Sequence, residues 1–339
     1  MSEIRQNLLT GEWVIVAPER ARRPADLCKP HSAAGTVPAR SETCPFCPGN
    51  EKVAAEERFR LAGPDGDWRV RSLVNKFSVL VPGGEAAFTA DPLGQRVSGV
   101  GLHEVIVEHR RHDLGPATAG AAALREVLGV WRQRFTAFYA DPRIRHVVVF
   151  KNHGEDAGAS QQHPHSQIVG LPMAPGQVEE RRERVRRFFA ERGRCLGCFL
   201  LEQELAAGAR VVQATDDFVA YIPFAALSPF HLWIFPRHHR ACFGDLDDAH
   251  LAAFADVLCG VLGRLYTALG NPAFNLVLRS LGPREGHAPD FHWYLSIVPR
   301  VCKAAGFELG SGMYVNSASP EGNAGILRQA ALPAADAGD

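Results

Sequence analysis

The sequence His163-Pro164-His165-Ser166-Gln167 lies between two apolar segments that are typical of β-strands. Side chains alternate between the two faces of a strand, so His163, His165 and Gln167 share one face. On that face one histidine can bind a metal, while His165 attacks a phosphorus atom and Gln167 holds a phosphoryl oxygen. The competing interpretation is a half-buried strand with two hydrogen-bonded histidines. The rest of the chain favours the chemical interpretation.

A pattern of cysteines, strands, a helix and histidines occurs twice along the chain. The first copy begins at Cys44-Pro45-Phe46-Cys47 and passes through strand-like runs at 72–82 and 103–108 to His112. An amphipathic helix follows, and then two strands, the second of which carries the histidine motif. The second copy begins at Cys195-Leu196-Gly197-Cys198 and keeps the same order.

The two copies also agree in their spacing. His112 precedes His163 by 51 residues, and His239 precedes His292 by 53. We therefore predict an internal duplication of one α+β unit. Each unit is expected to be a mainly antiparallel sheet with flanking helices.

Each copy supplies two cysteines and two distant histidines, and structural zinc prefers four such ligands in a tetrahedron. The predicted ligands are Cys44, Cys47, His112 and His163 in the first copy, and Cys195, Cys198, His239 and His292 in the second. In the second copy His231 and His238 remain rival ligands. Either site could instead be a vestige that binds no metal.

The copies differ at the candidate nucleophile. In the second copy Tyr294 stands where the first has His165, and Ser296 stands where the first has Gln167. The duplication therefore keeps two candidate zinc sites but only one candidate nucleophile. We expect one half to catalyse and the other to serve as a scaffold.

Length and composition are those of a globular protein with a full core. We expect residues 1–174 to form the first repeat, 175–325 the second, and 326–339 a disordered tail. Acidic and basic side chains balance at 37 each, which predicts neither a nucleic-acid nor a membrane partner. The N-terminus lacks the apolar core of a secretory signal, and we expect a cytoplasmic protein. The basic run at 181–187 alternates with glutamates and is interpreted as a solvated helix face.

Two interpretations from other classes remain. In a zinc-ribbon nucleic-acid-binding protein, both cysteine pairs would share one zinc. The separation of about 150 residues between the pairs and the zero net charge argue against it. The second interpretation is a non-catalytic protein that binds zinc or a nucleotide. It gives the intact histidine motif no function.

Taken together, these residues resemble the galactose-1-phosphate uridylyltransferase family, the transferase branch of the histidine-triad superfamily. The likeness begins at residues 9–18 (LTGEWVIVAP), includes 44–49 (CPFCPG) and peaks at the HPHSQ motif. It ends near Gly306-Phe307-Glu308 and so covers nearly the whole chain. The resemblance implies a duplicated histidine-triad-like fold, a homodimer, and zinc that is structural.

The resemblance also implies a ping-pong reaction of galactose metabolism. His165 takes a uridylyl group from UDP-glucose, releases glucose 1-phosphate, and passes the group to galactose 1-phosphate. A phosphate leaving group is already a stable anion, so no strong general acid is needed. Gln167 suits this chemistry because an amide stabilises oxyanion charge but does not readily protonate the histidine–phosphorus bond.

Further site residues are implied by position. Arg20 and Arg23 match phosphate-binding arginines, although a solvated basic turn is the alternative. Residues that match positions lining the nucleotide and phosphate pocket are Asn75, Asn152, Gly158, Ser160 and Gln167. Ser160 is expected to donate its hydroxyl to a phosphoryl oxygen and is counted with His165 and Gln167 as catalytic.

The substrate is less firmly indicated than the chemistry. Phe307 and Glu308 stand where well-known uridylyltransferases carry Tyr-Glu and select the hexose. Ser166 inside the motif resembles the branch that contains ADP-glucose phosphorylase, which moves an adenylyl group to phosphate. We favour a UDP-glucose–hexose-1-phosphate uridylyltransferase and keep adenylyl transfer as the alternative.

Overall fold

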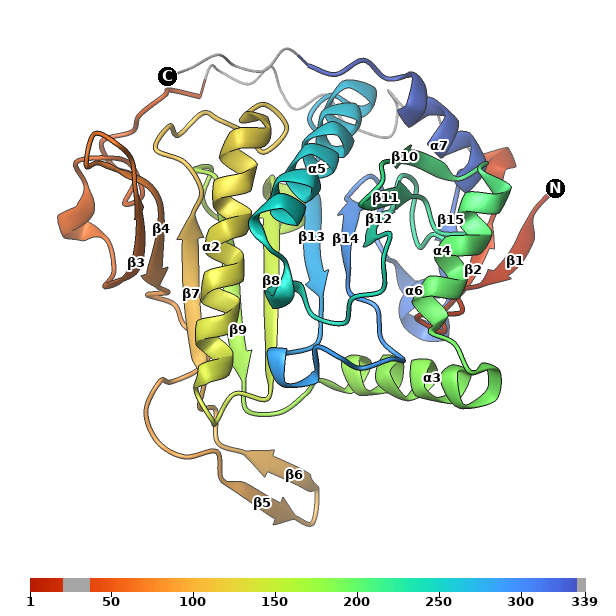
Figure 1. Cartoon of the computed structure of the whole chain (residues 1–339), viewed down its shortest axis with the longest axis horizontal. Coiled ribbons are helices and arrows are strands. Elements are labelled where there is room, and N and C mark those ends of the chain that lie inside the picture. The colour runs from red at the N-terminus through yellow and green to blue at the C-terminus, as the bar shows by residue number, and fades with distance from the viewer. Residues whose placement is uncertain (21–36, 334–339) are drawn as a thin grey trace.

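Backbone pairing joins the two halves of the chain into one ten-stranded sheet (Figure 1). The computed structural model describes residues 1–20 and 37–333. In order across the sheet, the strands are β10 (Val211–Ala214), β11 (Phe218–Tyr221), β12 (Leu232–Pro236), β14 (Tyr294–Pro299), β13 (Phe274–Arg279), β8 (His146–His153), β9 (His165–Leu171), β7 (Leu102–Val107), β4 (Trp68–Val74) and β3 (Glu57–Ala62). Every pair in this sheet is antiparallel, so the predicted α+β class and mainly antiparallel sheet are confirmed.

The register of the central strands decides which side chains share a face. Residues directly opposite each other in an antiparallel pair point to the same side. Phe150 on β8 lies opposite both Gln167 on β9 and Val277 on β13. Two residues along β8, Asn152 is therefore level with His165, and it pairs with Asn275 on β13. The site face thus runs continuously from one repeat into the other.

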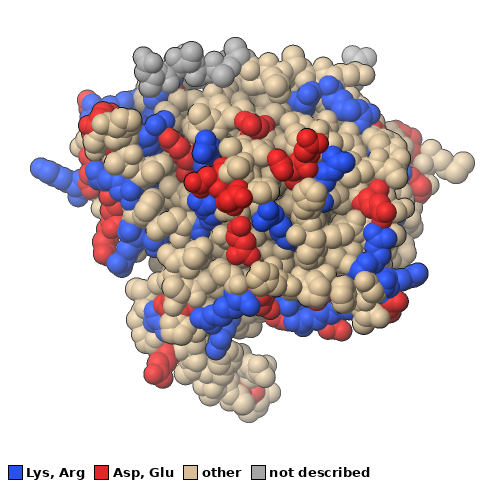
Figure 2. Space-filling view, in the orientation of Figure 1, with Lys and Arg blue, Asp and Glu red and all other residues tan. Residues whose placement is uncertain are grey.

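The opposite face of the sheet is covered by α2 (Gly120–Ala140) and α5 (Asp248–Leu269), which pack against each other (Figure 1). Helix α5 begins at Asp247, whose carboxylate accepts the backbone N–H of His250 at 2.8 Å. Its length and apolar composition would suffice to cross a membrane, but it packs on strand β11 and on α2 as a core helix. On the side of the molecule seen in Figure 2, acidic and basic side chains are intermixed, in keeping with the zero net charge.

The remaining elements surround this two-layer core. The other helices are α3 (Gly176–Arg192), α4 (Leu196–Ala207), α6 (Gly306–Ser311) and α7 (Pro320–Gln329), with short 3-10 turns η1 (Pro18–Arg20), η2 (Glu51–Val53), η3 (Glu155–Ala157), η4 (Phe243–Asp245) and η5 (Pro283–Glu285). Strands β1 (Glu3–Gln6), β2 (Trp13–Val16) and β15 (Tyr314–Asn316) form a small separate sheet. The hairpin of β5 (Phe88–Asp91) and β6 (Gly94–Val97) projects from the body (Figure 1).

The expected tail at 326–339 is wrong for its first residues. Helix α7 continues to Gln329, and Leu327 is fully buried. The helix begins where the Ser319 hydroxyl accepts the Gly322 N–H at 3.2 Å, and it packs on α5. The alanine-rich composition of this segment predicts disorder. The few apolar residues that α7 buries, Leu327 among them, do not stand out in such a sequence. Residues 334–339 lie outside the described part of the chain.

Helix α7 is tied to the N-terminal strand β1 and to the segment before β10 by one carboxylate. Glu321 accepts hydrogen bonds from Arg5 Nη1 at 2.9 Å and from Arg210 Nη1 at 2.8 Å. Burial raises the pKa of Glu321, but these hydrogen bonds outweigh burial and lower the pKa to about 2. A carboxylate with a lowered folded-state pKa stabilises the fold above its unfolded pKa, and the effect fades as the pH falls toward 2.

We therefore expect Glu321→Gln to lower the free energy of unfolding by about 1 kcal/mol at pH 7, a value reduced by the partial exposure of the pair. At pH 3 the loss should be smaller, because the carboxyl of the unfolded chain is largely protonated there and the ionised folded form contributes less stability. Urea unfolding of both proteins at both pH values measures the difference. Equal losses at the two pH values would contradict the assignment.

Candidate active site and metal centres

His165 opens strand β9 and is held in one ring tautomer. Its Nδ1 lies 2.8 Å from the backbone carbonyl oxygen of His163. A carbonyl oxygen only accepts hydrogen bonds, so Nδ1 carries the proton and donates it. The lone pair is therefore on Nε2, which makes this nitrogen the nucleophilic atom of the ring.

The surroundings of His165 also keep its ring neutral. Its residue surface is only 7% exposed, and burial lowers the pKa of His165, with the positive charge of Lys151 lowering it further. Lys151 Nζ donates to Glu108 at 2.6 Å and to the carbonyl oxygen of His165 at 3.0 Å. On the helix face of the same strand, Trp131 Nε1 donates to the Ser166 hydroxyl at 2.8 Å. Strand β9 is thus fixed on both sides of the nucleophile.

The amide of Gln167 is held by a histidine on the neighbouring strand β7. His103 Nδ1 accepts the backbone N–H of Val79 at 3.4 Å, which places the proton of His103 on Nε2. This Nε2 lies 2.9 Å from Gln167 Oε1, to which it donates, and 2.9 Å from Asn75 Nδ2, so His103, Asn75 and Gln167 form one polar cluster. Asn75 Nδ2 lies 3.5 Å from the same oxygen, so the structure places Asn75 beside Gln167. Among residues 1–20 and 37–333, only the oxygen of the Gln167 amide is engaged, so its nitrogen can donate to a ligand.

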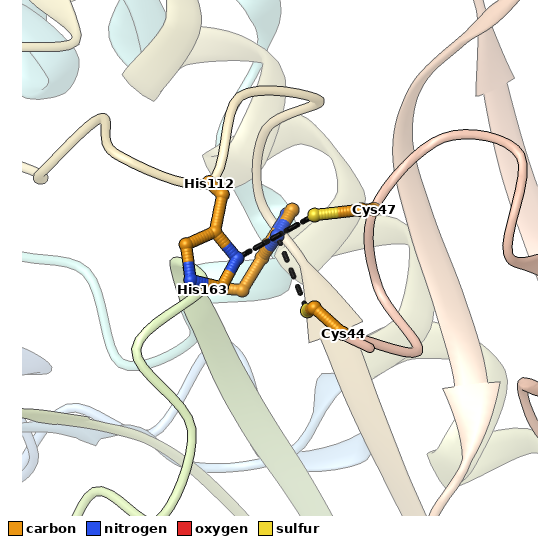
Figure 3. A group of neighbouring side chains, drawn as sticks. All are labelled: Cys44, Cys47, His112 and His163. Atoms are coloured by element: carbon orange, nitrogen blue, oxygen red, sulfur yellow. Dashed lines mark hydrogen bonds between the residues drawn. The ribbon is translucent and has the colours of Figure 1, made fainter. Parts of the chain in front are cut away.

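The first set of predicted metal ligands comes together beside this strand (Figure 3). The Nδ1 atoms of His112 and His163 are 3.3 Å apart. Cys47 Sγ lies 3.5 Å from each of these nitrogens, and Cys44 Sγ lies 3.7 Å from His163 Nδ1. A zinc tetrahedron with ordinary bond lengths requires N···N separations of about 3.3 Å and S···N separations of about 3.6 Å. All four residues are buried, and the donor set fits structural zinc.

The second set also converges, at the other end of the duplicated pattern. Cys198 Sγ lies 3.2 Å from His239 Nδ1 and 3.5 Å from His292 Nδ1, and Cys195 completes the group. The rival His231 is elsewhere, with its Nε2 3.0 Å from the Ser296 hydroxyl. This cluster is more open than the first, because His239 is exposed and Cys198 is partly so.

Both sites use a backbone carbonyl to orient one ligand histidine. His163 Nε2 donates to the carbonyl oxygen of His109 at 2.7 Å, and His239 Nε2 donates to that of Ala288 at 3.0 Å. Such a contact leaves Nδ1 free for a metal and fixes the ring. His163 and His239 are not equivalent positions of the two copies, so each site orients a different member of its histidine pair.

The other predicted site residues fall into three groups. Those lining a cavity of about 1500 Å³ on the site face of the sheet are Arg20, Asn152, Phe307 and Glu308. Ser160 is exposed on the loop between η3 and β9, and Gly158 closes η3 with a φ of +85°, which favours glycine. Arg23 lies outside the described residues.

The basic run on α3 is more than the solvated face that we expected. Arg182 is buried, and its Nη2 pairs with Glu285 at 3.0 Å. Arg181 lines the cavity. Alternating signs of charge predict solvation, but Arg182 is buried against Glu285 and Arg181 lines the cavity.

Comparison with known proteins now identifies the family. A family model described as galactose-1-phosphate uridyl transferase, N-terminal domain, matches residues 1–175. The chain is 33% identical to ADP-glucose phosphorylase of Arabidopsis thaliana, over 97% of this chain and 93% of that protein. The chain belongs to the galactose-1-phosphate uridylyltransferase family. It is also 25% identical to galactose-1-phosphate uridylyltransferase of Thermotoga maritima, over 97% of this chain and 98% of that protein.

Solved structures agree over nearly the whole length of this family member. ADP-glucose phosphorylase from Arabidopsis thaliana with bound ADP-glucose superposes with a TM-score of 0.82 at 29% identity, over 98% of this chain and all of that one. A uridylyltransferase structure gives 0.74 at 26% identity, over 97% of this chain and 98% of the other. The predicted family and fold are confirmed, and the protein is a nucleotidyltransferase of this family.

Sequence reasoning missed several residues that support the nucleophile. His103, Lys151 and Glu108 lie in strand or strand-end segments that were interpreted as structural, and only their polar character within apolar runs could have drawn attention. Phe46, inside the first cysteine pair, packs on the His165 ring with centroids 5.8 Å apart. It therefore connects the metal-binding loop to the nucleophile.

We expect His103→Phe to lower the rate of nucleotidyl transfer by about tenfold to a hundredfold, because Gln167 loses the donor that orients its amide. The KM for the nucleotide donor should change much less. If His103 acts through Gln167, the double variant with Gln167→Ala should be no slower than Gln167→Ala alone. Additive losses in steady-state kinetics would show that His103 acts independently.

Proposed function

We propose that this protein transfers a nucleoside monophosphate from a nucleoside diphosphate hexose through a covalent intermediate on His165. We further propose ADP-glucose as the donor and inorganic phosphate as the acceptor. The observation that carries the mechanism is the hydrogen bond from His165 Nδ1 to the His163 carbonyl, which leaves a lone pair on Nε2.

In the first step, Nε2 of His165 attacks the α-phosphorus of the donor. A nitrogen–phosphorus bond forms, and the bond to the bridging oxygen breaks. The hexose 1-phosphate leaves as an anion and carries away the bond electrons, so no acid is required. Positive charge develops on the imidazole ring, and the carbonyl of His163 stabilises it at Nδ1–H. Gln167 donates from its amide nitrogen to a phosphoryl oxygen of the transition state.

In the second step, an oxygen of the acceptor phosphate attacks the same phosphorus atom. The nitrogen–phosphorus bond breaks, and its electrons return to Nε2. The products are a nucleoside diphosphate and the original neutral histidine. A hexose 1-phosphate acceptor would react in the same way and would yield a new nucleoside diphosphate hexose.

We choose the adenylyl group because this chain is more similar in sequence to an ADP-glucose phosphorylase than to a uridylyltransferase. Identity is 33% with the plant ADP-glucose phosphorylase and 25% with the Thermotoga maritima uridylyltransferase, at nearly equal coverage. Phe307, in place of the tyrosine noted above, and Ser166 point the same way. Uridylyl transfer between UDP-glucose and galactose 1-phosphate, which the sequence analysis favoured, is the second candidate, supported by the match to the uridylyl transferase family model.

The test is the mass of the intact protein after brief incubation with each donor and no acceptor. ADP-glucose should add one adenylyl group per chain, and inorganic phosphate should then remove it and yield ADP. A uridylyl adduct that galactose 1-phosphate removes would select the second candidate. No adduct with either donor would reject the covalent mechanism.

We also infer that zinc fills both cysteine–histidine clusters and that the active enzyme is a homodimer. Zinc would be structural, because four protein ligands close each tetrahedron. Elemental analysis gives the zinc content, and light scattering of the purified protein gives the mass in solution. A zinc-free protein or a monomer would reject the corresponding inference.

A further inference from the structure

The second repeat carries its own version of the site face. Arg279 lies directly opposite Tyr294 on the paired strands β13 and β14. Tyr294 is the counterpart of His165, and Asn152 is level with His165 in the first repeat. Arg279 therefore occupies the position that Asn152 holds in the first repeat. The duplicate face has exchanged a histidine for a tyrosine and a neutral amide for a guanidinium.

A second guanidinium faces the same space. Arg181, on helix α3, lines the cavity together with Arg279. Neither has a carboxylate within 4 Å among residues 1–20 and 37–333, unlike their neighbour Arg182. The Arg181 Nη1 atom is buried and has no hydrogen-bond partner in the described part of the chain. A buried guanidinium nitrogen without a partner is costly, and a ligand that accepts its hydrogen bond relieves the cost.

A hydroxyl donor lies in the same cavity wall. Ser228 is buried, and its Oγ finds no hydrogen-bond partner among the described residues. Glu12 also lines the cavity, and its buried Oε2 is likewise unpartnered. Over the whole cavity, five cationic side chains face two carboxylates, in a chain whose net charge is zero. The cavity lining is therefore positively charged, whereas acidic and basic side chains balance over the chain as a whole.

The pKa values of nearby groups are those expected beside two positive charges that lie close together. Burial lowers the pKa of Arg279 and the charge of Arg181 lowers it further, while Tyr294 and Glu12 oppose this shift. Burial also lowers the pKa of His231 to about 3, with Arg181 and Arg279 contributing. His231 is therefore neutral, and the two guanidinium groups remain charged because arginine does not lose its proton in proteins.

We propose that Arg181, Arg279 and Ser228 form a second, non-catalytic anion site that binds inorganic phosphate or the phosphate of a phosphomonoester. Guanidinium groups donate in pairs to phosphate oxygens, and a serine hydroxyl supplies a further donor. Tyr294 stands at the position of the nucleophilic histidine, so the second repeat lacks the counterpart of His165. Two strand spacings and four residues along the strands place Arg279 about 16 Å from His165, so this anion cannot be the phosphoryl group under attack.

Isothermal titration with inorganic phosphate tests this proposal on the intact protein. Because inorganic phosphate is also the proposed acceptor, wild type should show two binding events. Arg279→Met and Arg181→Met should each weaken one of them by at least tenfold and leave the other unchanged, while Arg279→Lys weakens it less. Arg187→Met is the matched control, because Arg187 is exposed on the same helix, and it should bind as wild type does. Adenosine monophosphate in place of phosphate distinguishes a free anion from a phosphomonoester.

The second anion site and the covalent mechanism on His165 can fail independently in these experiments. Adduct formation on His165 is measured in the same variants, and Arg279→Met should still form it. Phosphate binding that is unchanged in both methionine variants would overturn the second site without affecting the covalent mechanism. If Arg279→Met does not fold, Arg181→Met carries the test alone, since Arg181 lies on a peripheral helix and is only partly buried.

Discussion

Replacing His165 with glycine is expected to abolish nucleotidyl transfer, with a loss of more than about a thousandfold, while the protein remains folded. The reason is that Nε2 of His165 is the atom to which the nucleotidyl group becomes attached, and no other group can take its place. Phe46, which packs on the His165 ring, is aromatic, and Lys151, which donates to the His165 carbonyl oxygen, is ion-paired with Glu108. Intact mass after incubation with ADP-glucose or UDP-glucose should then show no added nucleotidyl group.

His287→Gly provides the matched control, because His287 is exposed and remote in sequence from the motif. This variant should form the adduct at the wild-type rate. Circular dichroism and zinc content should be unchanged in His165→Gly, since its ring binds no metal in the proposed scheme. A His165→Gly protein that still acquires the nucleotidyl group would place the nucleophile elsewhere.

Replacing Cys44 with serine is expected to remove about one zinc per chain and to lower the melting temperature by about 5–10 °C. The first cluster joins the loop at 44–47, the segment after β7 and the start of β9, so its loss separates three segments that are distant in sequence. Transfer should fall as well, because the backbone carbonyl of the ligand His163 holds the ring of His165. Zinc analysis, differential scanning calorimetry and the adduct assay measure the three effects.

Cys198→Ser should also remove one zinc but should leave adduct formation largely intact, because the second cluster lies in the other repeat. Cys302→Ser is the control, since Cys302 is an exposed free cysteine outside both clusters. It should change neither the zinc content nor the melting temperature. If Cys44→Ser and Cys198→Ser reduced transfer equally, the link through His163 would be wrong.

Periodicity and spacing were sufficient for the main architecture. The two cysteine pairs, the long apolar helices and the closing strands all lie where the sequence predicts them, and both metal clusters assemble from the predicted residues. These features are local, or they depend on the order of a few side chains along the chain. They can therefore be predicted from a single sequence.

The errors have a common physical origin in tertiary contacts. The apolar run at 72–82 predicts one strand, but β4 ends at Val74, where the Asn75 side chain accepts the Phe77 N–H at 2.9 Å and turns the chain. Arg181 is predicted to be solvated, because the cavity that it lines is formed largely by strands that are distant from it in sequence. His103 carried no signal, since its contact with Gln167 depends on the pairing of β7 with β9.

The pairing of β8 with β13 has an evolutionary consequence. In an assembly of two identical subunits, every substitution changes both copies of a surface at once. Here backbone hydrogen bonds join two unequal units within one polypeptide, so each surface is encoded by its own stretch of the gene. Fusion of this kind releases the second unit from selection for catalysis. It can then lose a nucleophile and diverge in ligand preference while it continues to complete the shared sheet.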